Sequence, residues 1–414
     1  MKSNLISLSM KKFSYLLFYM TIIISAGCQG PTNYFGWRGP ERNGTVDDFI
    51  IPTEWPSELT KSWQTEVDLG DASPILVGDK IFLHVNADSM EHAICLDSNT
   101  GEIVWETSIN AAPEVTGGAR THPGPRSTPG YVKDKIITHG AGGVLACLDA
   151  DDGEILWKKE TYTYEVPRFF TSVSPLIIND MCIMHLGGHE KGVIVALDYE
   201  TGDEVWKIEG EPSTYSSPVL WESNPEQILV QTETDLLGIS TDGKILWRIP
   251  TPGERMFYNS STPVFNGNIH YISGQGLGTT AYEVSSSDGA YTIDSLWNNP
   301  DFGVSFCTPV VKDGFIYGND KRFGYIYCLN AVTGQTAWAD TTKLNRFAAM
   351  FDLGETMSSL PANGELIFFE PNTTEYVELA KYKISDTEVY ASPVYQGNMV
   401  FVKDEKHITC WELK

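Results

Sequence analysis

Residues 95–105 read Cys-Leu-Asp-Ser-Asn-Thr-Gly-Glu-Ile-Val-Trp, and variants of this phrase recur along the chain. Three further copies occupy 147–157, 196–206 and 328–338, and two weaker copies end at Trp247 and Trp297. Successive copies end 41 to 52 residues apart, which is the size of one supersecondary unit and not of a whole domain. The 414 residues are therefore organised as internal repeats, and the repeat decides the fold.

Each copy has the chemistry of a strand, a turn and a second strand. A small residue ends an apolar run, Asp and Thr-Gly supply turn geometry because glycine takes positive φ freely, and Trp lies in the strand that follows. A Ser-Pro or Thr-Pro pair precedes each unit, followed by a short apolar stretch, a polar turn and a β-rich run. Seven such pairs begin at residues 73, 128, 174, 217, 262, 308 and 392, and Ser359-Leu360 is interpreted as a degenerate eighth. Eight units of four strands predict an all-β fold, an eight-bladed β-propeller.

The two ends of the repeat region predict how the ring closes. The unit that begins at Ser392 has room for only three strands before Lys414. Residues 62–67, Ser-Trp-Gln-Thr-Glu-Val, precede the first Ser-Pro pair and look like the missing outer strand with its Trp63. We expect this N-terminal strand to join the last blade, because closure removes both free edges. The seventh unit carries Lys-Tyr-Lys, centred on Tyr382, where the others carry Trp.

The phrase Ala-x-Asp-x-x-Thr-Gly-x-x-x-Trp resembles the tryptophan-docking repeat of quinoprotein dehydrogenases and of BamB-like lipoproteins, which share a PQQ-like eight-bladed propeller. The resemblance covers the chain from about residue 60 onward. Residues 36–44, Gly-Trp-Arg-Gly-Pro-Glu-Arg-Asn-Gly, are similar to the N-terminal segment of bacterial proteins with this repeat. We therefore divide the chain into a signal peptide at 1–27, a tether with the Trp-Arg-Gly-Pro segment at 28–60, and a propeller at 61–414.

The two branches of this resemblance imply different functions. The BamB-like lipoproteins are non-enzymatic, which implies a protein-interaction platform whose partners are envelope proteins or a peptide segment. The quinoprotein enzymes bind pyrroloquinoline quinone on the axis with calcium and an Asp base, which implies oxidation of an alcohol or a sugar. We predict the platform, with no cofactor and no catalytic residue, because no calcium triad or catalytic Asp can be mapped by motif. The dehydrogenase stays as the alternative, and a sensory or carbohydrate-associated propeller is a third hypothesis.

The N-terminus has the pattern of a bacterial export signal. Basic residues precede an apolar run at 13–24, and Ser-Ala-Gly-Cys at 25–28 resembles a lipobox, in which Cys28 would be lipidated. Lipoproteins usually carry Leu three residues before that Cys, where this chain has Ser, so a soluble periplasmic protein stays open. We expect a periplasm-facing lipoprotein anchored in the cell envelope, at the inner or the outer membrane, with translation starting at Met1 or Met10.

The positions of the cysteines and the net charge of the chain limit which bonds and which functions are possible. Four cysteines fill the same small-residue position in different units, so we expect their Cα atoms to lie beyond the roughly 7 Å limit for a disulfide and their thiols to be buried and free. They are Cys95, Cys147, Cys328 and Cys410. The formal charge of −25 excludes a general nucleic-acid role, because phosphate binding requires clustered Lys and Arg. We expect a monomeric propeller.

In a propeller, the loops that lead into the first strands surround a funnel over the axis. Here these loops are rich in arginine and aromatic residues, which are enriched in binding hot spots. The candidate funnel residues are Arg120, His122, Arg126, Arg168, Phe169, Tyr215, Arg255, Tyr258, Phe306, Arg346 and Tyr390. Two interpretations stay open: they contact a partner or ligand, or they plug the channel and brace neighbouring blades.

Three histidines share one register. His84, His139 and His185 each lie ten residues after a repeat Pro, at the expected end of the second strand. Such a set could ligate a metal, but hydrogen-bonding residues repeated from blade to blade explain it more simply, so they are only weak metal candidates. The acidic run at 149–153 resembles part of a calcium loop, yet it fills the turn of the repeat phrase. We predict no metal site.

Overall fold

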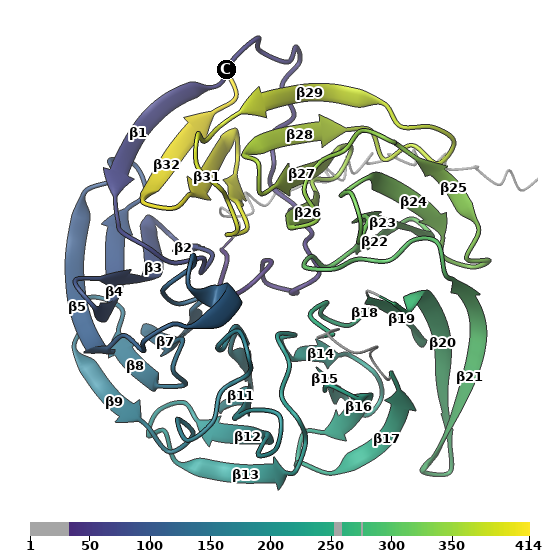
Figure 1. Cartoon of the computed structure of the whole chain (residues 1–414), viewed down its shortest axis with the longest axis horizontal. Helices are drawn as coiled ribbons and strands as arrows, with labels where there is room; N and C mark the ends of the chain where they lie inside the picture. Colours follow the sequence, from purple (N-terminus) through teal and green to yellow (C-terminus); the bar gives the residue numbers. More distant parts are fainter. Residues whose placement is uncertain (1–32, 252–258, 275) are drawn as a thin grey trace, which may run out of the picture. The chain divides into compact units, whose positions relative to one another are not determined.

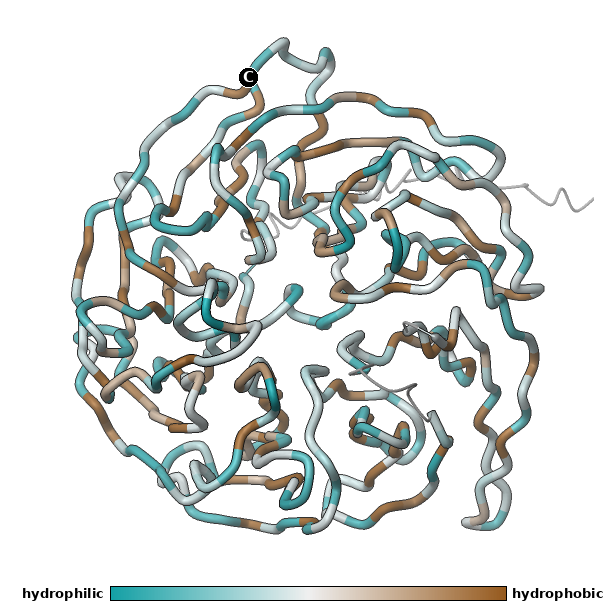
Figure 2. Tube along the Cα trace, viewed as in Figure 1, coloured by the Kyte–Doolittle hydropathy of each residue, from teal (hydrophilic) through white to brown (hydrophobic). Residues whose placement is uncertain are grey.

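The computed structural model describes residues 33–251, 259–274 and 276–414, which form an all-β ring of eight four-stranded sheets (Figure 1). We call these sheets blades 1 to 8. Within the described residues the one helix is a short 3-10 helix, η1 (Gly117–Ala119). Apolar residues run along the strands of each blade, whereas most turns are hydrophilic (Figure 2). The eight-bladed propeller predicted from the repeats is confirmed.

The strands of each blade pair antiparallel, and in blades 1 to 7 they follow chain order from the innermost to the outermost. Blade 1 consists of β2 (Ile75–Val77), β3 (Lys80–Ala87), β4 (Met90–Asp97) and β5 (Ile103–Ala111). Blade 2 consists of β6 (Gly130–Val132), β7 (Lys135–His139), β8 (Leu145–Asp149) and β9 (Ile155–Lys159). Blade 3 consists of β10 (Leu176–Ile178), β11 (Met181–Leu186), β12 (Val193–Asp198) and β13 (Glu204–Glu209). Blade 4 consists of β14 (Val219–Trp221), β15 (Gln227–Gln231), β16 (Asp235–Ser240) and β17 (Ile245–Pro250).

The second half of the ring has the same plan. Blade 5 consists of β18 (Val264–Asn266), β19 (Ile269–Gly274), β20 (Gly278–Ser287) and β21 (Ala290–Asn299). Blade 6 consists of β22 (Val310–Lys312), β23 (Phe315–Asn319), β24 (Ile326–Asn330) and β25 (Thr336–Ala339). Blade 7 consists of β26 (Ala348–Asp352), β27 (Met357–Pro361), β28 (Glu365–Phe369) and β29 (Glu378–Lys383). Blade 8 consists of β30 (Val394–Gln396), β31 (Met399–Lys403), β32 (His407–Glu412) and β1 (Thr60–Glu66).

Blade 8 is closed by the N-terminal strand, as predicted. β1 pairs antiparallel with β32, with Trp63 opposite Cys410 and Glu66 opposite His407. Figure 1 shows the purple β1 beside the yellow β32. The pairing gives the last blade its fourth strand. Strands from the beginning and the end of the repeat region therefore meet in one sheet, which closes the ring.

In six blades the outer-strand Trp docks on the next blade. In blade 1, Trp105 lies opposite the small Cys95. Its N–H donates to the carbonyl oxygen of Ala150 in the turn of blade 2 (3.2 Å), where Gly153 lies against the indole with φ +75°. A Cβ at residue 153 would come within 2.6 Å of the ring, so this turn requires glycine for space and for conformation. The same link is made by Trp63, Trp157, Trp206, Trp297 and Trp338. The repeat phrase is therefore a blade-to-blade contact.

Blades 4 and 5 meet in a different way. Trp247 of β17 donates its N–H to Gln227 Oε1 of its own blade (2.6 Å). Trp221 of β14 supplies the link instead, because its N–H donates to the carbonyl oxygen of Gly267 in blade 5 (3.0 Å). The buried ring of His270 packs edge-on against Trp221, with centroids 4.5 Å apart. The weak repeat copy at Trp247 thus marks a different contact.

The first strand of blade 7 lacks the repeat marker. β26 begins at Ala348, after Arg346 and Phe347 and not after a Ser-Pro or Thr-Pro pair. The pair Ser359-Leu360 lies in β27, the second strand. Its interpretation as a degenerate first-strand marker is therefore wrong, although the blade itself is present.

Blade 7 also exchanges large and small residues. Where other blades place a small residue opposite Trp, it places Phe368 opposite Ala380. Trp55, from the segment before β1, covers Phe368 with ring centroids 4.7 Å apart. Tyr382 lies two residues beyond the Trp position and donates its hydroxyl to the carbonyl oxygen of Pro56 (2.8 Å). A Trp from outside the blade therefore covers the position that its own Trp would fill.

Residues 33–58, which we call the N-terminal strap, pack into the ring, although we expected a tether (Figure 1). Arg38 is 4% exposed and donates to both carbonyl oxygens of the Thr-Pro pair of blade 6 (2.7 and 3.2 Å). Arg42 is 7% exposed and donates to both carbonyl oxygens of the Ser-Pro pair of blade 3 (3.1 and 2.5 Å). Burial lowers the pKa of both guanidinium groups to about 10, so both remain cations. The strap ties two blades that are not neighbours.

The cysteines behave as the sequence predicts. The six in the described residues are buried and free, and burial raises the pKa of Cys95 to about 12. Cys28 and the rest of the export signal lie outside the described residues. In the part of the chain that is described, no helix has the length and apolar character needed to cross a membrane.

Candidate binding site on the axis

A cavity of about 480 Å³, which we call the axial funnel, is lined by the loops that precede the first strands. All eight blades contribute to its wall, and the strap contributes Trp37. In blade order, one lining residue from each is Asp71, His122, Phe169, Tyr215, Ser260, Phe306, Phe347 and Tyr390. A cavity with this lining lies on the axis of the ring.

The Ser-Pro and Thr-Pro pairs hold these loops in place. The backbone N–H of Ser174 donates to the hydroxyl oxygen of Ser217 in the next blade (2.9 Å). The same link joins Thr128 to Ser174, Ser217 to Thr262, Thr262 to Thr308, and Ser392 to Ser73. Proline then directly precedes the first strand, where a missing N–H is tolerated. The marker thus links blades 2 to 6 in series and blade 8 to blade 1.

One wall of the funnel is a continuous stack of rings. Phe306 and Phe347 lie parallel, with centroids 4.2 Å apart and 4° between their planes. Phe347 meets Tyr390 edge-on at 4.9 Å, and Tyr390 meets His122 edge-on at 4.4 Å. The guanidinium carbon of Arg346 lies 5.2 Å from the centre of the Phe306 ring. The wall therefore offers a preformed aromatic surface with a cation at its edge.

The ionisable side chains of the funnel other than tyrosine are mainly basic: His122, Arg126 and Arg346 against Asp71. His122 Nδ1 lies 3.3 Å from Asp71 Oδ2, and this hydrogen bond raises the pKa of His122. Arg126 donates through Nη2 to the carbonyl oxygen of His122 (2.6 Å), and burial lowers its pKa. Its Nη1 is buried and has no hydrogen-bond partner among the described residues. A buried donor without a partner is unfavourable by about 1–3 kcal/mol, so an acceptor on a bound ligand would stabilise it.

Seven of the eleven candidate funnel residues line this cavity: His122, Arg126, Phe169, Tyr215, Phe306, Arg346 and Tyr390. Arg168 adjoins it through its guanidinium, 5.7 Å from the centre of the Phe169 ring. Arg120 is exposed at the end of η1 and does not belong to the lining. Arg255 and Tyr258 lie outside the described residues.

Ten of the lining residues were not selected as candidates from the sequence, among them Asp71 and Trp37. Asp71 lies two residues before the Ser73 marker, so the loop rule that found the other residues could have found it. Trp37 comes from the strap, and nothing in the repeat indicates that this segment reaches the axis.

The three histidines in shared register are structural. They lie on β3, β7 and β11, and all are buried. His139 Nδ1 donates to a carbonyl oxygen at 2.9 Å and His185 Nε2 donates to another at 3.0 Å. Burial lowers the pKa to about 4 in both, and to about 3 in His84. Among the described residues, no three His, Cys, Asp or Glu side chains come together in a group that could hold a metal.

The sequence was compared with known proteins. The family described as outer membrane protein assembly factor BamB matches residues 89–340, which is more than half of the chain. The chain belongs to this family. It is 26% identical over 254 residues to BamB of Yersinia pestis, covering 57% of this chain and 60% of that protein. It is 28% identical over 165 residues to methanol dehydrogenase subunit 1 of Methylorubrum extorquens, covering 36% of this chain and 25% of that protein. The BamB-family chain thus spans less than two thirds of either relative.

Solved structures agree with the fold. BamB from Moraxella catarrhalis superposes with a TM-score of 0.63 at 15% identity, over 86% of this chain and 98% of that one. A europium-containing methanol dehydrogenase superposes with a TM-score of 0.72 at 12% identity, over 93% of this chain and 99% of that one. An assembly factor and a dehydrogenase therefore both share the propeller of this BamB-family chain.

The quinoprotein branch implies pyrroloquinoline quinone with calcium, and the described funnel residues do not fit that pair. Calcium takes roughly six to eight oxygen ligands, mostly from carboxylates, amides and carbonyls. Among the described lining residues, Asp71 is the single carboxylate and is already paired with His122, and no Asn or Gln side chain is present. The guanidinium groups of Arg126 and Arg346 lie in the same wall and repel a bound cation.

Proposed function

We propose that the chain is an exported, lipid-anchored propeller that acts as a protein-interaction platform in the bacterial cell envelope, holding a segment of a partner protein in the axial funnel. The observation that carries the proposal is the lining of the funnel. Loops from all eight blades contribute to it, and it contains an aromatic stack and two arginines. Membership of the BamB family supports it, because that family is described as an assembly factor.

The physical argument rests on preorganisation. Aromatic and arginine side chains dominate the centres of protein interfaces. In the funnel, the rings of Phe306, Phe347 and Tyr390 already contact one another, so a partner orders few side chains on binding. The basic groups lie within a chain of formal charge −25 and favour a partner segment with acidic and apolar side chains.

The test is site-specific crosslinking. Benzoylphenylalanine in place of Phe169 should crosslink to an envelope protein identified by mass spectrometry, whereas the same probe in place of the exposed Arg120 should not. Arg126→Gln and Tyr390→Ala should each reduce the crosslinked fraction about tenfold, as expected for hot-spot residues worth more than 1 kcal/mol. Arg120→Gln is the matched control on the same loop. Equal crosslinking in all three variants would refute the funnel as the contact surface.

The alternative is a quinone-dependent dehydrogenase, and the similarity to methanol dehydrogenase over 165 residues favours it. It requires a carboxylate base within hydrogen-bond reach of the substrate hydroxyl, and Asp71 is the described candidate. Dye-linked oxidation of methanol, ethanol or glucose should be measured after incubation with pyrroloquinoline quinone and calcium. We expect no turnover. Calcium-dependent turnover that is lost in Asp71→Asn would replace the platform proposal.

A further inference from the structure

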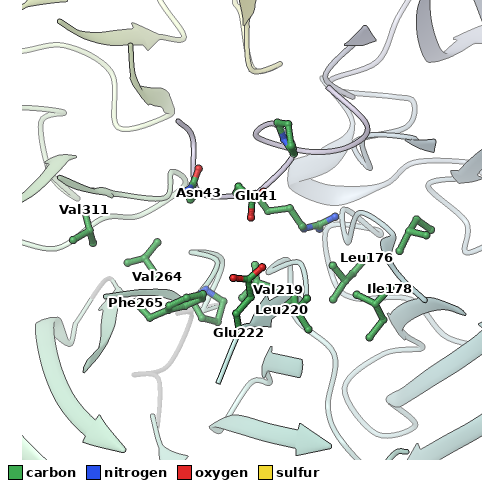
Figure 3. A pocket seen from close by; sticks show the side chains of 14 residues that line it. Glu41, Asn43, Leu176, Ile178, Val219, Leu220, Glu222, Val264, Phe265 and Val311 are labelled. Atoms are coloured by element: carbon green, nitrogen blue, oxygen red, sulfur yellow. The ribbon is translucent and has the colours of Figure 1, made fainter. Parts of the chain in front are cut away.

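A second cavity, of about 250 Å³, lies against the strap, and we call it the strap cavity (Figure 3). Residues 40–43 of the strap form part of its wall, and the rest comes from the first strands of blades 3 to 6 and from residues directly next to them. The funnel is lined by residues before the repeat Pro, whereas this cavity is lined by residues that follow it. The two cavities therefore open at different levels along the axis.

The side of the strap cavity formed by the strands is apolar, whereas its charged and amide side chains come from residues 41–43 and Glu222. The apolar side includes the middle residue of four successive first strands, each of them half-buried: Ile177, Leu220, Phe265 and Val311. In blade 2 the corresponding residue is Tyr131, and there the strap covers it, because the ring of Phe35 stacks on it at 5.6 Å. The strap thus covers this strand position in blade 2 and leaves it open to the cavity in blades 3 to 6.

Two carboxylates face each other across this cavity. Figure 3 shows Glu41, from the strap, and Glu222, which directly follows β14, pointing toward one another. Both are exposed, and neither has a hydrogen-bond or ion-pair partner in the described part of the chain. The cation in the wall, Arg42, is directed to the carbonyl oxygens of the Ser-Pro pair of blade 3. Like charges placed opposite one another are unfavourable unless a cation lies between them.

We propose that the strap cavity receives a lysine or arginine side chain from an apolar segment of a partner protein. The aliphatic stem of such a side chain packs on Ile177 and Leu220, and the cation lies between Glu41 and Glu222, beside the ring of Phe265. Charge complementarity selects this occupant, because an apolar side chain leaves both carboxylates without a partner. The inference concerns a different cavity from the funnel, so it stands independently of the function proposed there.

The probe is a pair of peptides that differ in one charge. Fluorescein-labelled Ala-Leu-Lys-Leu-Ala amide and its norleucine counterpart, Ala-Leu-Nle-Leu-Ala amide, should be titrated with the full chain by fluorescence anisotropy. We expect the lysine peptide to bind roughly tenfold more tightly than the norleucine peptide, and its advantage to shrink at high salt. Glu41→Gln and Glu222→Gln should each weaken the lysine peptide roughly threefold.

The controls distinguish binding in the strap cavity from binding in the axial funnel, and a basic side chain from a metal ion. Glu226→Gln, an exposed glutamate just beyond Glu222 that is not part of the cavity lining, should leave binding unchanged, and so should the funnel variant Arg126→Gln. Equal affinity for both peptides, or equal effects of Glu222→Gln and Glu226→Gln, would overturn the proposal. Displacement of the lysine peptide by millimolar calcium that acts only through Glu41 and Glu222 would assign the cavity to a metal ion and also overturn it.

Discussion

Acidification should unfold this propeller well above the pH at which its carboxylates are protonated, because four buried histidines resist protonation. They are His84, His139, His185 and His270. Burial lowers their pKa from 6.5 to between about 3 and about 4. The unfolded chain takes up protons on these residues below pH 6.5, whereas the folded chain does not. Stability is therefore unaffected at pH 7 and is lost as the pH falls from 6.5 toward 4.

The size of the loss follows from the linkage between protonation and folding. At pH 5 each histidine reduces the free energy of unfolding by about 2 kcal/mol, or about 8 kcal/mol for the four, at 1.36 kcal/mol per pH unit. That loss is comparable with a typical total stability of about 5–15 kcal/mol. Two groups act in the opposite direction, because burial raises the pKa of Glu91 and the hydrogen bond to Asp71 raises that of His122.

The assay is urea unfolding followed by tryptophan fluorescence at pH 7, 6 and 5. His84→Leu is the informative variant, because both ring nitrogens of His84 lack a hydrogen-bond partner among the described residues. It should resemble the wild type at pH 7 and lose about 2 kcal/mol less between pH 7 and pH 5. His189→Gln, on an exposed histidine, is the control. If wild type and His84→Leu lose the same free energy, the reasoning from burial is wrong.

Three further outcomes are expected. Deleting residues 1–69, and with them β1, should give an aggregating chain because blade 8 is left with an open edge, and a soluble, cooperatively folding product would contradict the closure argument. Arg38→Met should lower the free energy of unfolding by about 3 kcal/mol through lost hydrogen bonds from a charged donor, so removal of residues 28–58 should also destabilise the ring; an unchanged urea midpoint would refute this. Cys28→Ser should release the protein from membranes with its circular dichroism spectrum unchanged. If a clickable palmitate analogue does not label the wild type, the predicted lipid anchor is refuted.

The fold was predictable where the sequence repeats a local contact. The small residue, the Thr-Gly turn and the Trp of one phrase all take part in docking between neighbouring blades, so six blades show the same pattern. The start of blade 7 was placed wrongly because its first strand follows Arg346 and Phe347 and no Ser-Pro or Thr-Pro pair. Its missing Trp reflects the exchange of sizes between Phe368 and Ala380, and Trp55 compensates from outside the repeat. No pattern within the repeat could have indicated that exchange.

The candidate site was predictable to the extent that it belongs to the same repeat. Loops before the first strands converge on the axis in any propeller, which is why Phe169, Tyr215 and Tyr390 could be selected by position alone. Trp37 and the strap could not, because their contacts join segments far apart in the chain and depend on space left inside the closed ring. The strap cavity could not be predicted from the sequence for the same reason.

Ring closure occurs late in the synthesis of this chain, because it pairs two strands that lie far apart in the sequence. Ser62 and Glu412, hydrogen-bonded across the closing pair of strands, are 350 positions apart, so β1 leaves the ribosome long before its partner exists. Arg38 of the strap likewise donates to the carbonyl oxygen of Thr308, which is made 270 positions later. A chain that is cut short during synthesis or export keeps an unpaired strand and a loose strap, both of which are open to proteases. The propeller therefore closes only after β32 has been made, because β32 is the strand with which β1 pairs.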